Sequence, residues 1–157
     1  MNLYAESSAV LAWLLDESSA SEVRRLLVEA NIIVASDLTL IECDRVLLRA
    51  VSQNELTEAE AADRRAHLAD AAAYWHILRI AAETVDRARQ PFPGEPIRTL
   101  DAIHLASALT ARAAIADLRL LSLDDRVRKS AKRLGFQLLP ERGGVQVRRQ
   151  TVCTPDE

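Results

Sequence analysis

Glycine and cysteine are both scarce in this chain of 157 residues, and each scarcity excludes a class of protein. All four glycines lie at or beyond Gly94, so there is no glycine-rich loop of the kind that a nucleotide-binding fold places after its first strand. The two cysteines, Cys43 and Cys153, are far apart and belong to no Cys/His cluster. A zinc finger and a disulfide-stapled scaffold are therefore excluded.

Long apolar runs and a basic leader are also missing. No apolar stretch approaches the roughly 20 residues that a helix needs to span a membrane. The segment Met1–Glu17 contains the acidic Glu6 and no basic residue, so it does not have the pattern of a signal peptide. Together with the sparing use of cysteine, this predicts a cytoplasmic protein that does not associate with membranes.

An excess of basic residues is missing as well. The chain has 20 Lys and Arg against 23 Asp and Glu, for a formal net charge of −3. A protein that binds nucleic acid through charge alone is usually basic, so we exclude that class. An enzyme whose acidic site is neutralised by bound cations remains possible.

What the chain does have is short apolar runs that alternate with helical patterns, and 49% of its residues are apolar. This alternation predicts an α/β sandwich with a central, mainly parallel sheet of four to five strands flanked by helices. The domain should cover residues 1–140, followed by a polar tail at 141–157. We expect strands at Leu3–Ala5, Asn31–Ala35, Leu118–Leu123 and Phe136–Leu139, with Trp75–Ile80 either a strand or the approach to a helix. We expect helices over Ser7–Leu15, Ser19–Glu29, Leu38–Val51, Glu55–Ala73, Thr84–Arg89, Thr99–Ala114 and Asp125–Leu134, the last capped by Gly135.

Four acidic residues occupy related positions in this scheme. Glu6 ends the first strand, and Glu42 lies in the first turns of the helix after the second. Asp101 starts a helix, and Asp124 follows a late strand. Ligand sites in parallel sheets lie beyond the carboxyl ends of the strands, so all four should meet at one edge.

A cluster of carboxylates needs a cation or shared protons, because two unit charges about 4 Å apart repel by roughly 4 kcal/mol at an effective dielectric constant of 20. Oxygen-only ligands favour Mg²⁺ or Mn²⁺, bound as one ion or two. Such an ion lowers the pKa of a bound water and stabilises charge on an attacked phosphate, which is the chemistry of a nuclease.

Each acid also has a plain structural explanation. Asp101 suits the first turn of a helix, and Asp124 or Asp125 suits a helix N-cap. Either of these two neighbours is eligible as the fourth acid, and we prefer Asp124 because it lies nearer the strand. We expect His104, three residues after Asp101, to be a packed structural residue rather than a proton carrier.

Four segments resemble the PIN domain, in particular the VapC-type toxins. They are YAESSAVLAWLL at Tyr4–Leu15, ASDLTLIECDRVLLRA at Ala35–Ala50, RTLDAIHLASAL at Arg98–Leu109 and LLSLDDRVRKSAKRLGF at Leu120–Phe136. Together they cover nearly the whole chain in the family's order and spacing.

The resemblance implies specific roles. Glu6, Glu42, Asp101 and Asp124 would be the catalytic and metal-binding acids, supported by Ser8 and Ser122. The protein would be a Mg²⁺- or Mn²⁺-dependent endoribonuclease toxin that cleaves tRNA or ribosomal RNA, forms a homodimer and is inhibited by a VapB-like antitoxin. The family's usual first acid is Asp, whereas this chain has Glu6. That departure supports an alternative, a catalytically weakened PIN-like module that binds RNA or a protein without cutting.

Basic residues near these acids are candidates for contacts with RNA phosphates. Arg98 precedes the helix of Asp101, and Arg126 and Arg128 follow Asp124. Ion pairing with Asp101 or with Glu95 is an equally good interpretation of Arg98, and a solvated helix face is an equally good one of the other two.

Overall fold

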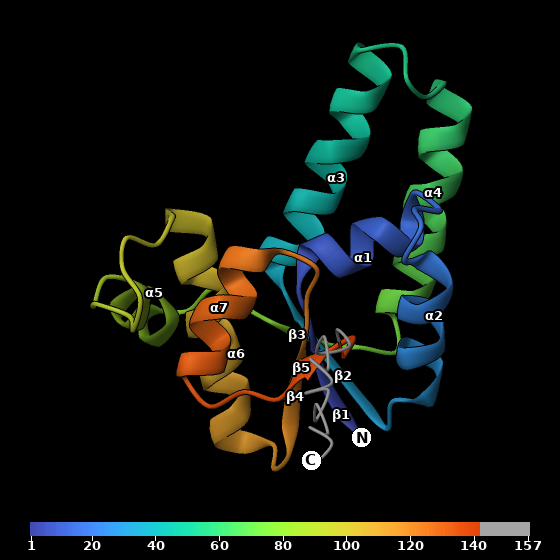
Figure 1. Ribbon diagram of the computed structural model, residues 1–157. Helices are drawn as coiled ribbons and strands as arrows, with labels where there is room; N and C mark the ends of the chain where they lie inside the picture. The colour runs from blue at the N-terminus through green and yellow to red at the C-terminus, as the bar shows by residue number, and fades with distance from the viewer. Residues whose placement is uncertain (142–157) are drawn as a thin grey trace, which may run out of the picture.

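Short runs of leucine, isoleucine and valine form a sheet of five strands in which every neighbouring pair is parallel (Figure 1). The computed structural model describes residues 1–141. The strands are β1 (Asn2–Ala5), β2 (Ile32–Ser36), β3 (His76–Leu78), β4 (Leu118–Leu121) and β5 (Leu138–Leu139), in the spatial order β3-β2-β1-β4-β5. The predicted parallel α/β sandwich is confirmed.

Seven helices in the described part of the chain cover the two faces of this sheet. They are α1 (Ser7–Leu14), α2 (Ala20–Glu29), α3 (Asp37–Ser52), α4 (Glu58–Ala72), α5 (Ala82–Ala88), α6 (Thr99–Ala114) and α7 (Asp125–Arg133). One face is covered by α5, α6 and α7, and the other by α1, α2 and α4 (Figure 1). The alternation of strands with helices requires this arrangement, because each parallel connection crosses a face of the sheet.

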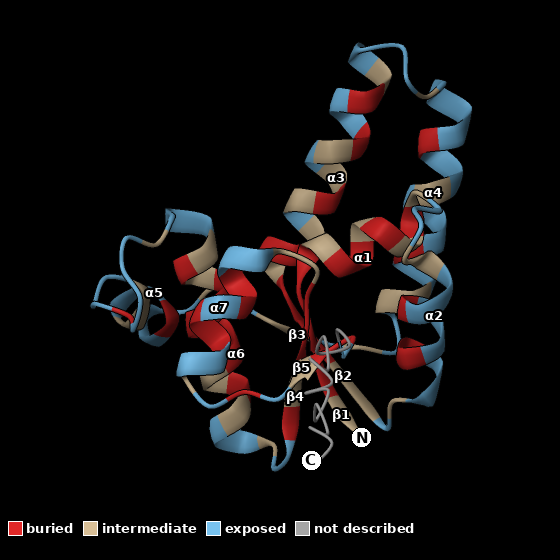
Figure 2. Cartoon of the chain, viewed as in Figure 1, coloured by how far each residue is buried: buried red, intermediate tan, exposed pale blue. Residues whose placement is uncertain are grey.

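The central strand β1 belongs to both apolar cores. Side chains alternate along a strand, so Leu3 and Ala5 face the core beneath α1 and α2, whereas Tyr4 faces the core beneath α6. All three are fully buried, and Figure 2 shows the middle of the sheet as the most buried part of the molecule. Residues that directly follow β1 are therefore held by packing on both sides.

Most predicted helices and strands differ from the observed ones by one to three residues at an end, and three strands need further comment. The ambiguous segment Trp75–Ile80 contains strand β3. Strand β5 is shorter than predicted, and β4 ends at Leu121 rather than at Leu123. The backbone N–H groups of Leu123 and Asp124 donate to Ser8 Oγ, at 2.8 and 3.1 Å, instead of continuing the strand ladder. The sequence suggested that Asp124 follows the strand directly. In the structure, Ser122 and Leu123 lie between the end of β4 and Asp124.

The termination of α7 follows the prediction. Gly135 has a φ of 82°, which lies in the left-handed region. Helices commonly end at a residue in this conformation, and glycine adopts it more readily than other residues do. Its N–H donates to Lys132 O at 3.0 Å. The predicted polar tail lies outside the described residues except for Glu141, as does Cys153. Within residues 1–141, no helix is both long and apolar enough to cross a membrane.

Helices α3 and α4 form a hairpin whose tip stands away from the sheet (Figure 1). The tip is largely exposed, whereas the root of α3, which carries Glu42, packs beside α1 and α6 (Figure 2). A cavity of about 850 Å³ is lined by residues of α1, α2 and α4, among them Trp13, Arg24 and Arg64. None of the four predicted acids lines this cavity.

Candidate functional site

Glu6 lies at the junction of β1 and α1, where its backbone is fixed. Its N–H donates to Leu121 O at 3.0 Å, which extends the pairing of β1 with β4. Its C=O accepts from the N–H groups of Ala9 and Val10 in α1. The residue is 3% exposed, so a carboxylate is held at the carboxyl end of the central strand, with little access to bulk water.

Three serine hydroxyls surround the Glu6 carboxylate. Ser7 Oγ donates to Oε1 at 2.8 Å, and Ser122 Oγ donates to Oε2 at 2.8 Å. Ser8 Oγ also donates to Oε2. The two serines predicted as supporting residues, Ser8 and Ser122, are thus brought into contact with Glu6, from α1 and from the end of β4. Hydrogen bonds from hydroxyl groups offset part of the cost of burying an ionised carboxylate.

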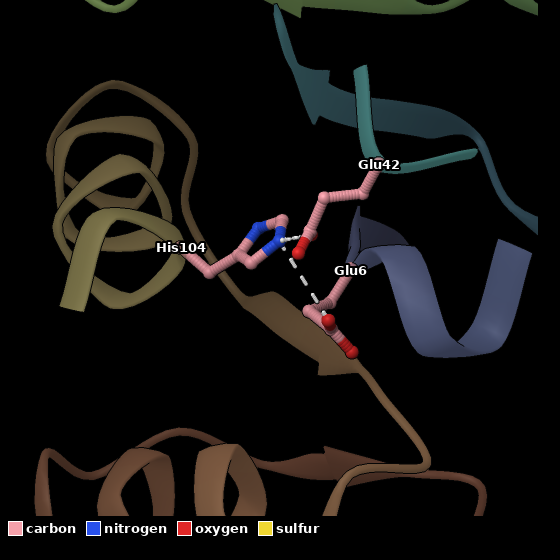
Figure 3. Close-up of side chains that lie close together, drawn as sticks. All are labelled: Glu6, Glu42 and His104. Carbon is pink, nitrogen blue, oxygen red and sulfur yellow. Dashed lines mark hydrogen bonds and ion pairs between the residues drawn. The ribbon is translucent and has the colours of Figure 1, made fainter. Parts of the chain in front are cut away.

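Glu42 approaches Glu6 from α3 and meets His104 from α6 (Figure 3). His104 Nε2 lies 2.6 Å from Glu42 Oε2 and 3.7 Å from Glu6 Oε1. Ser7 Oγ lies 2.6 Å from the same Glu42 oxygen. Burial alone would raise the pKa of Glu42, but the hydrogen bonds from His104 and Ser7 and the attraction of His104 lower it below its ordinary value.

Asp101 and Asp124 form a more open part of the site. Desolvation, followed by the charges of Asp124 and Glu6, raises the pKa of Asp101, while Arg98 and Arg126 act in the opposite direction. No hydrogen bond or salt bridge to the Asp101 side chain is found among residues 1–141. The structure therefore brings Asp101, Asp124 and Glu6 close enough to repel one another, without a direct contact between them.

Asp124 also caps α7. Its Oδ1 accepts from the N–H of Arg126 at 2.7 Å and from the N–H of Val127 at 3.2 Å. This is the N-cap role that its position in the sequence allowed. Both of these cap hydrogen bonds use Oδ1 of Asp124, whereas Asp125 lies in the first turn of α7 and is exposed. The geometry favours Asp124 over Asp125 as the fourth acid of the site.

The donor set suits a divalent cation. One oxygen each from Glu6 and Glu42, together with a nitrogen of His104, lies within 4.8 Å of the others. Asp101 adds a partly buried carboxylate, whose pKa is raised by desolvation and then by the negative charges of Asp124 and Glu6. Carboxylate oxygens select Mg²⁺ or Mn²⁺ over softer ions. The chemistry of the residues thus fits the predicted metal, although the structure itself contains no ion.

The three predicted RNA-binding arginines have different positions. Arg98 and Arg126 are exposed and lie near enough to Asp101 to lower its pKa. Arg128 is 8% exposed, and its guanidinium donates to the carbonyl groups of Ser122, Leu139 and Pro140 at 2.7 to 3.0 Å. The prediction for Arg128 is wrong, because its charged group is used to join the end of β4 to β5.

Sequence reasoning missed Ser7 and Tyr4. His104 is packed, as predicted, but its contact with Glu42 was not foreseen. Ser7 is the immediate neighbour of Glu6, and His104 lies one helical turn after Asp101, so both were close to predicted residues. Their roles depend on the approach of α3 to α6, which brings Glu42 to a histidine 62 positions later in the chain. No local pattern in the sequence records such a contact.

Comparisons with known proteins agree with this geometry. The model of the PIN domain family matches residues 3–133. Ribonuclease VapC46 of Mycobacterium tuberculosis (strain ATCC 25618 / H37Rv) is 36% identical over 138 residues, which is 87% of this chain and 95% of that protein.

Solved structures show the same fold at lower identity. The crystal structure of Mycobacterium tuberculosis VapC20, a Sarcin-Ricin loop cleaving toxin, has a TM-score of 0.60 at 14% identity, covering 86% of this chain and 96% of that one. The structure of VapBC2 from Rickettsia felis, bound to a DNA fragment from its promoter, has a TM-score of 0.57 at 16% identity, covering 88% and 97%. At such identities these likenesses show the fold alone.

Proposed function

Since the chain belongs to the PIN domain family and is homologous to a VapC ribonuclease, we propose that it is a metal-dependent endoribonuclease and the toxin of a toxin–antitoxin pair. The observation that carries this proposal is the gathering of Glu6, Glu42, Asp101 and Asp124 at one edge of the sheet, in a chain 36% identical to a ribonuclease.

In the proposed mechanism the four acids share one role, which is to hold the metal ion. A Mg²⁺ or Mn²⁺ ion held by these residues would supply an activated water and charge stabilisation at the phosphate. Glu6, Glu42, Asp101 and Asp124 would hold the ion, and Ser8 and Ser122 keep the Glu6 carboxylate directed into the site. We propose that Arg98 and Arg126, which are exposed and near enough to Asp101 to influence its pKa, bind phosphates of the RNA.

The proposed partners follow from the same family membership. We expect a tRNA or a ribosomal RNA as the substrate, a second copy of this chain in a homodimer, and a VapB-like antitoxin as the inhibitor, all in the cytoplasm. The antitoxin would block the acids, for example with an arginine that takes the place of the metal.

One observation favours a second candidate function. Glu6 replaces the family's usual Asp, and its carboxylate is already satisfied by three serine hydroxyls. A side chain held in this way fits a weakened PIN-like module that binds RNA or a protein without cutting it.

Cleavage of total RNA by the purified protein, with Mg²⁺, Mn²⁺ or EDTA, separates these two functions. We expect cutting only with metal, and a loss of at least about 100-fold in Asp101→Asn, because several kcal/mol of metal-based stabilisation depend on the acids. Cleavage that persists in EDTA, or in Asp101→Asn, would refute the proposed mechanism. If the wild type cuts no RNA with either metal, the binding module becomes the better description.

A further inference from the structure

His104 is a buried titratable group of the site that has no part in the mechanism above. It is 1% exposed, and it lies between Tyr4 on one side and Glu42 on the other. The Nδ1 atom is 3.3 Å from the Tyr4 hydroxyl, and the two rings meet edge to face at an interplanar angle of 77°. The imidazole is therefore fixed in plane and direction by the core beneath α6.

The proton in the contact between His104 and Glu42 belongs to the histidine. An ionised carboxylate has no hydrogen to give, so at 2.6 Å the donor is Nε2–H. On the other side of the ring, Nδ1 lies 3.3 Å from the Tyr4 hydroxyl. Burial raises the pKa of Tyr4, so its hydroxyl keeps its proton.

Glu42 depends on this donor more than Glu6 depends on any single partner. Among the described residues, only His104 and Ser7 donate to the Glu42 carboxylate. The Ser7 hydroxyl has one proton and two acceptors, because it also lies 2.8 Å from Glu6 Oε1. Whenever Ser7 donates to Glu6, His104 is the one remaining donor that directs Glu42 toward Glu6.

We propose that His104 is a positioning residue, whose Nε2–H aims the Glu42 carboxylate at the bound cation. A His104 nitrogen lies close enough to the two acids to be a ligand itself, but while Nε2 carries the hydrogen that it donates to Glu42 it has no lone pair for the metal. This inference rests on the proposed function, in which Glu42 is one of the metal ligands. Groups that orient metal ligands through hydrogen bonds commonly account for 10- to 100-fold in metal affinity.

The chain of contacts explains why this position calls for histidine. Ser36 at the end of β2 accepts from Tyr4 on β1, Tyr4 contacts His104 on α6, and His104 donates to Glu42 on α3. One rigid ring thus links the core beneath the sheet to a glutamate that has three rotatable bonds and a side chain 24% exposed. Without that link, Ser7 is the one side chain among residues 1–141 that still donates to Glu42, and only while it does not donate to Glu6.

Two substitutions of matched chemistry test the inference. His104→Gln keeps an N–H donor the same number of bonds from Cα as Nε2, whereas His104→Asn places its donor at the position of Nδ1. The probe is Mn²⁺ alone, titrated into the full chain, with free Mn²⁺ followed by electron paramagnetic resonance. Thermal unfolding of each variant without metal checks that it folds.

We expect His104→Gln to bind Mn²⁺ almost as tightly as the wild type, and His104→Asn to bind about 10- to 100-fold more weakly. Equal affinity in the wild type and His104→Asn would overturn the inference. Equal weakening in both variants would also overturn it, because the imidazole would then act as a ligand or as packing. If His104→Asn fails to fold, Tyr4→Phe serves in its place, with an expected loss of below about tenfold, and no loss would count against the inference.

RNA cleavage by the same proteins separates this inference from the proposed function. If the Mn²⁺ affinities follow the expected order but the wild type cuts no RNA, the positioning role stands and the ribonuclease proposal fails. If the wild type cuts RNA with metal but its Mn²⁺ affinity does not respond to His104, the ribonuclease proposal stands and the positioning role fails. A wild type that binds no Mn²⁺ refutes the inference directly.

Discussion

The site has two halves that handle negative charge differently. The inner pair, Glu6 and Glu42, is enclosed by three serine hydroxyls and His104, and the pKa of Glu42 is lowered. In the outer pair, Asp101 has no hydrogen-bond donor among residues 1–141, and its pKa is raised. The protein thus stabilises the carboxylates of Glu6 and Glu42 by hydrogen bonds, whereas it leaves Asp101 exposed to the negative charges of its neighbours.

This difference indicates where a cation contributes most. The inner acids are already held in place, so an ion gains pre-oriented ligands there at little cost in side-chain freedom. In the outer pair, Asp101 accepts no hydrogen bond from residues 1–141, so an ion there relieves its repulsion from Asp124 and Glu6. We therefore expect changes in the outer pair to affect catalysis most, and changes in the inner pair to affect both catalysis and stability.

Replacing Asp124 should break the outer pair without breaking its helix. Asn caps a helix as well as Asp does, so Asp124→Asn keeps the start of α7 and removes only the charge. We expect the metal-dependent rate of RNA cleavage to fall by at least about 100-fold. Asp125→Asn, at the exposed neighbouring position, is the matched control and should cut at nearly the wild-type rate. The reverse result would make Asp125 the fourth acid.

Shortening Glu6 tests how closely the inner pair is fitted. Glu6→Asp withdraws the carboxylate by about one bond, roughly 1.5 Å, from three hydroxyls that are placed for glutamate. A misplacement near 1 Å can lower a rate on the order of 100-fold, and we expect a decrease approaching that size in the initial rate with Mg²⁺. A faster Glu6→Asp enzyme would show instead that Glu6 weakens the chemistry and would favour the binding module.

Removing one hydroxyl from the inner pair should appear as a loss of stability. Ser122 is fully buried and donates to Glu6 Oε2 at 2.8 Å. Ser122→Ala leaves that buried oxygen with one hydroxyl fewer, which costs about 1–3 kcal/mol in the free energy of unfolding by urea. Ser52→Ala, which removes an exposed hydroxyl near the end of α3, should change it by less than about 0.5 kcal/mol. Equal effects of the two would mean that Glu6 does not rely on its hydroxyls.

The smallest effect concerns the charge of Asp101 in the absence of metal. Desolvation and the neighbours Asp124 and Glu6 raise the pKa of Asp101 in the folded protein, so folding favours its protonated form. Its contribution to stability is greatest below the pKa of the unfolded chain and is lost as the pH rises through the raised folded value. Asp101→Asn stays neutral, so its stability relative to the wild type should increase as the pH rises from about 3 to 7.

The increase in the free energy of unfolding of Asp101→Asn relative to the wild type should be below about 1 kcal/mol, because Asp101 is partly exposed and water screens its charge. At pH 7, saturating Mg²⁺ should make the wild type more stable than Asp101→Asn, since only the wild type keeps the full set of metal ligands. Melting curves of both proteins, with Mg²⁺ and with EDTA, measure both effects. An Asp101→Asn variant that is less stable than the wild type in EDTA at pH 7 would contradict the description of the outer pair.

The sequence predicted the positions of these acids better than their surroundings. The order of strands and helices follows from hydrophobic patterning, and parallel strands bring Glu6 and Asp124 to one edge whatever the details of packing. Contacts such as Glu42 with His104 depend on the approach of two helices distant in the chain, which no local pattern specifies. Arg128 shows the same limit, because a basic residue on a charged helix gave no sign that its guanidinium would be buried against three carbonyl groups.

The position of β1 at the centre of the sheet determines when the four acids come together during synthesis. Asn2 pairs with Ile32 in β2 on one side and with Leu118 in β4 on the other. The pairing of β1 with β4 therefore cannot form until the ribosome has synthesised the 116 residues that follow Asn2. At 5–20 residues per second, that wait lasts roughly 6–23 s. Because Asp101 and Asp124 arrive only in the last part of the domain, a nascent or prematurely released chain has no assembled site. The order of the strands thus delays the nuclease until almost the whole domain has left the ribosome.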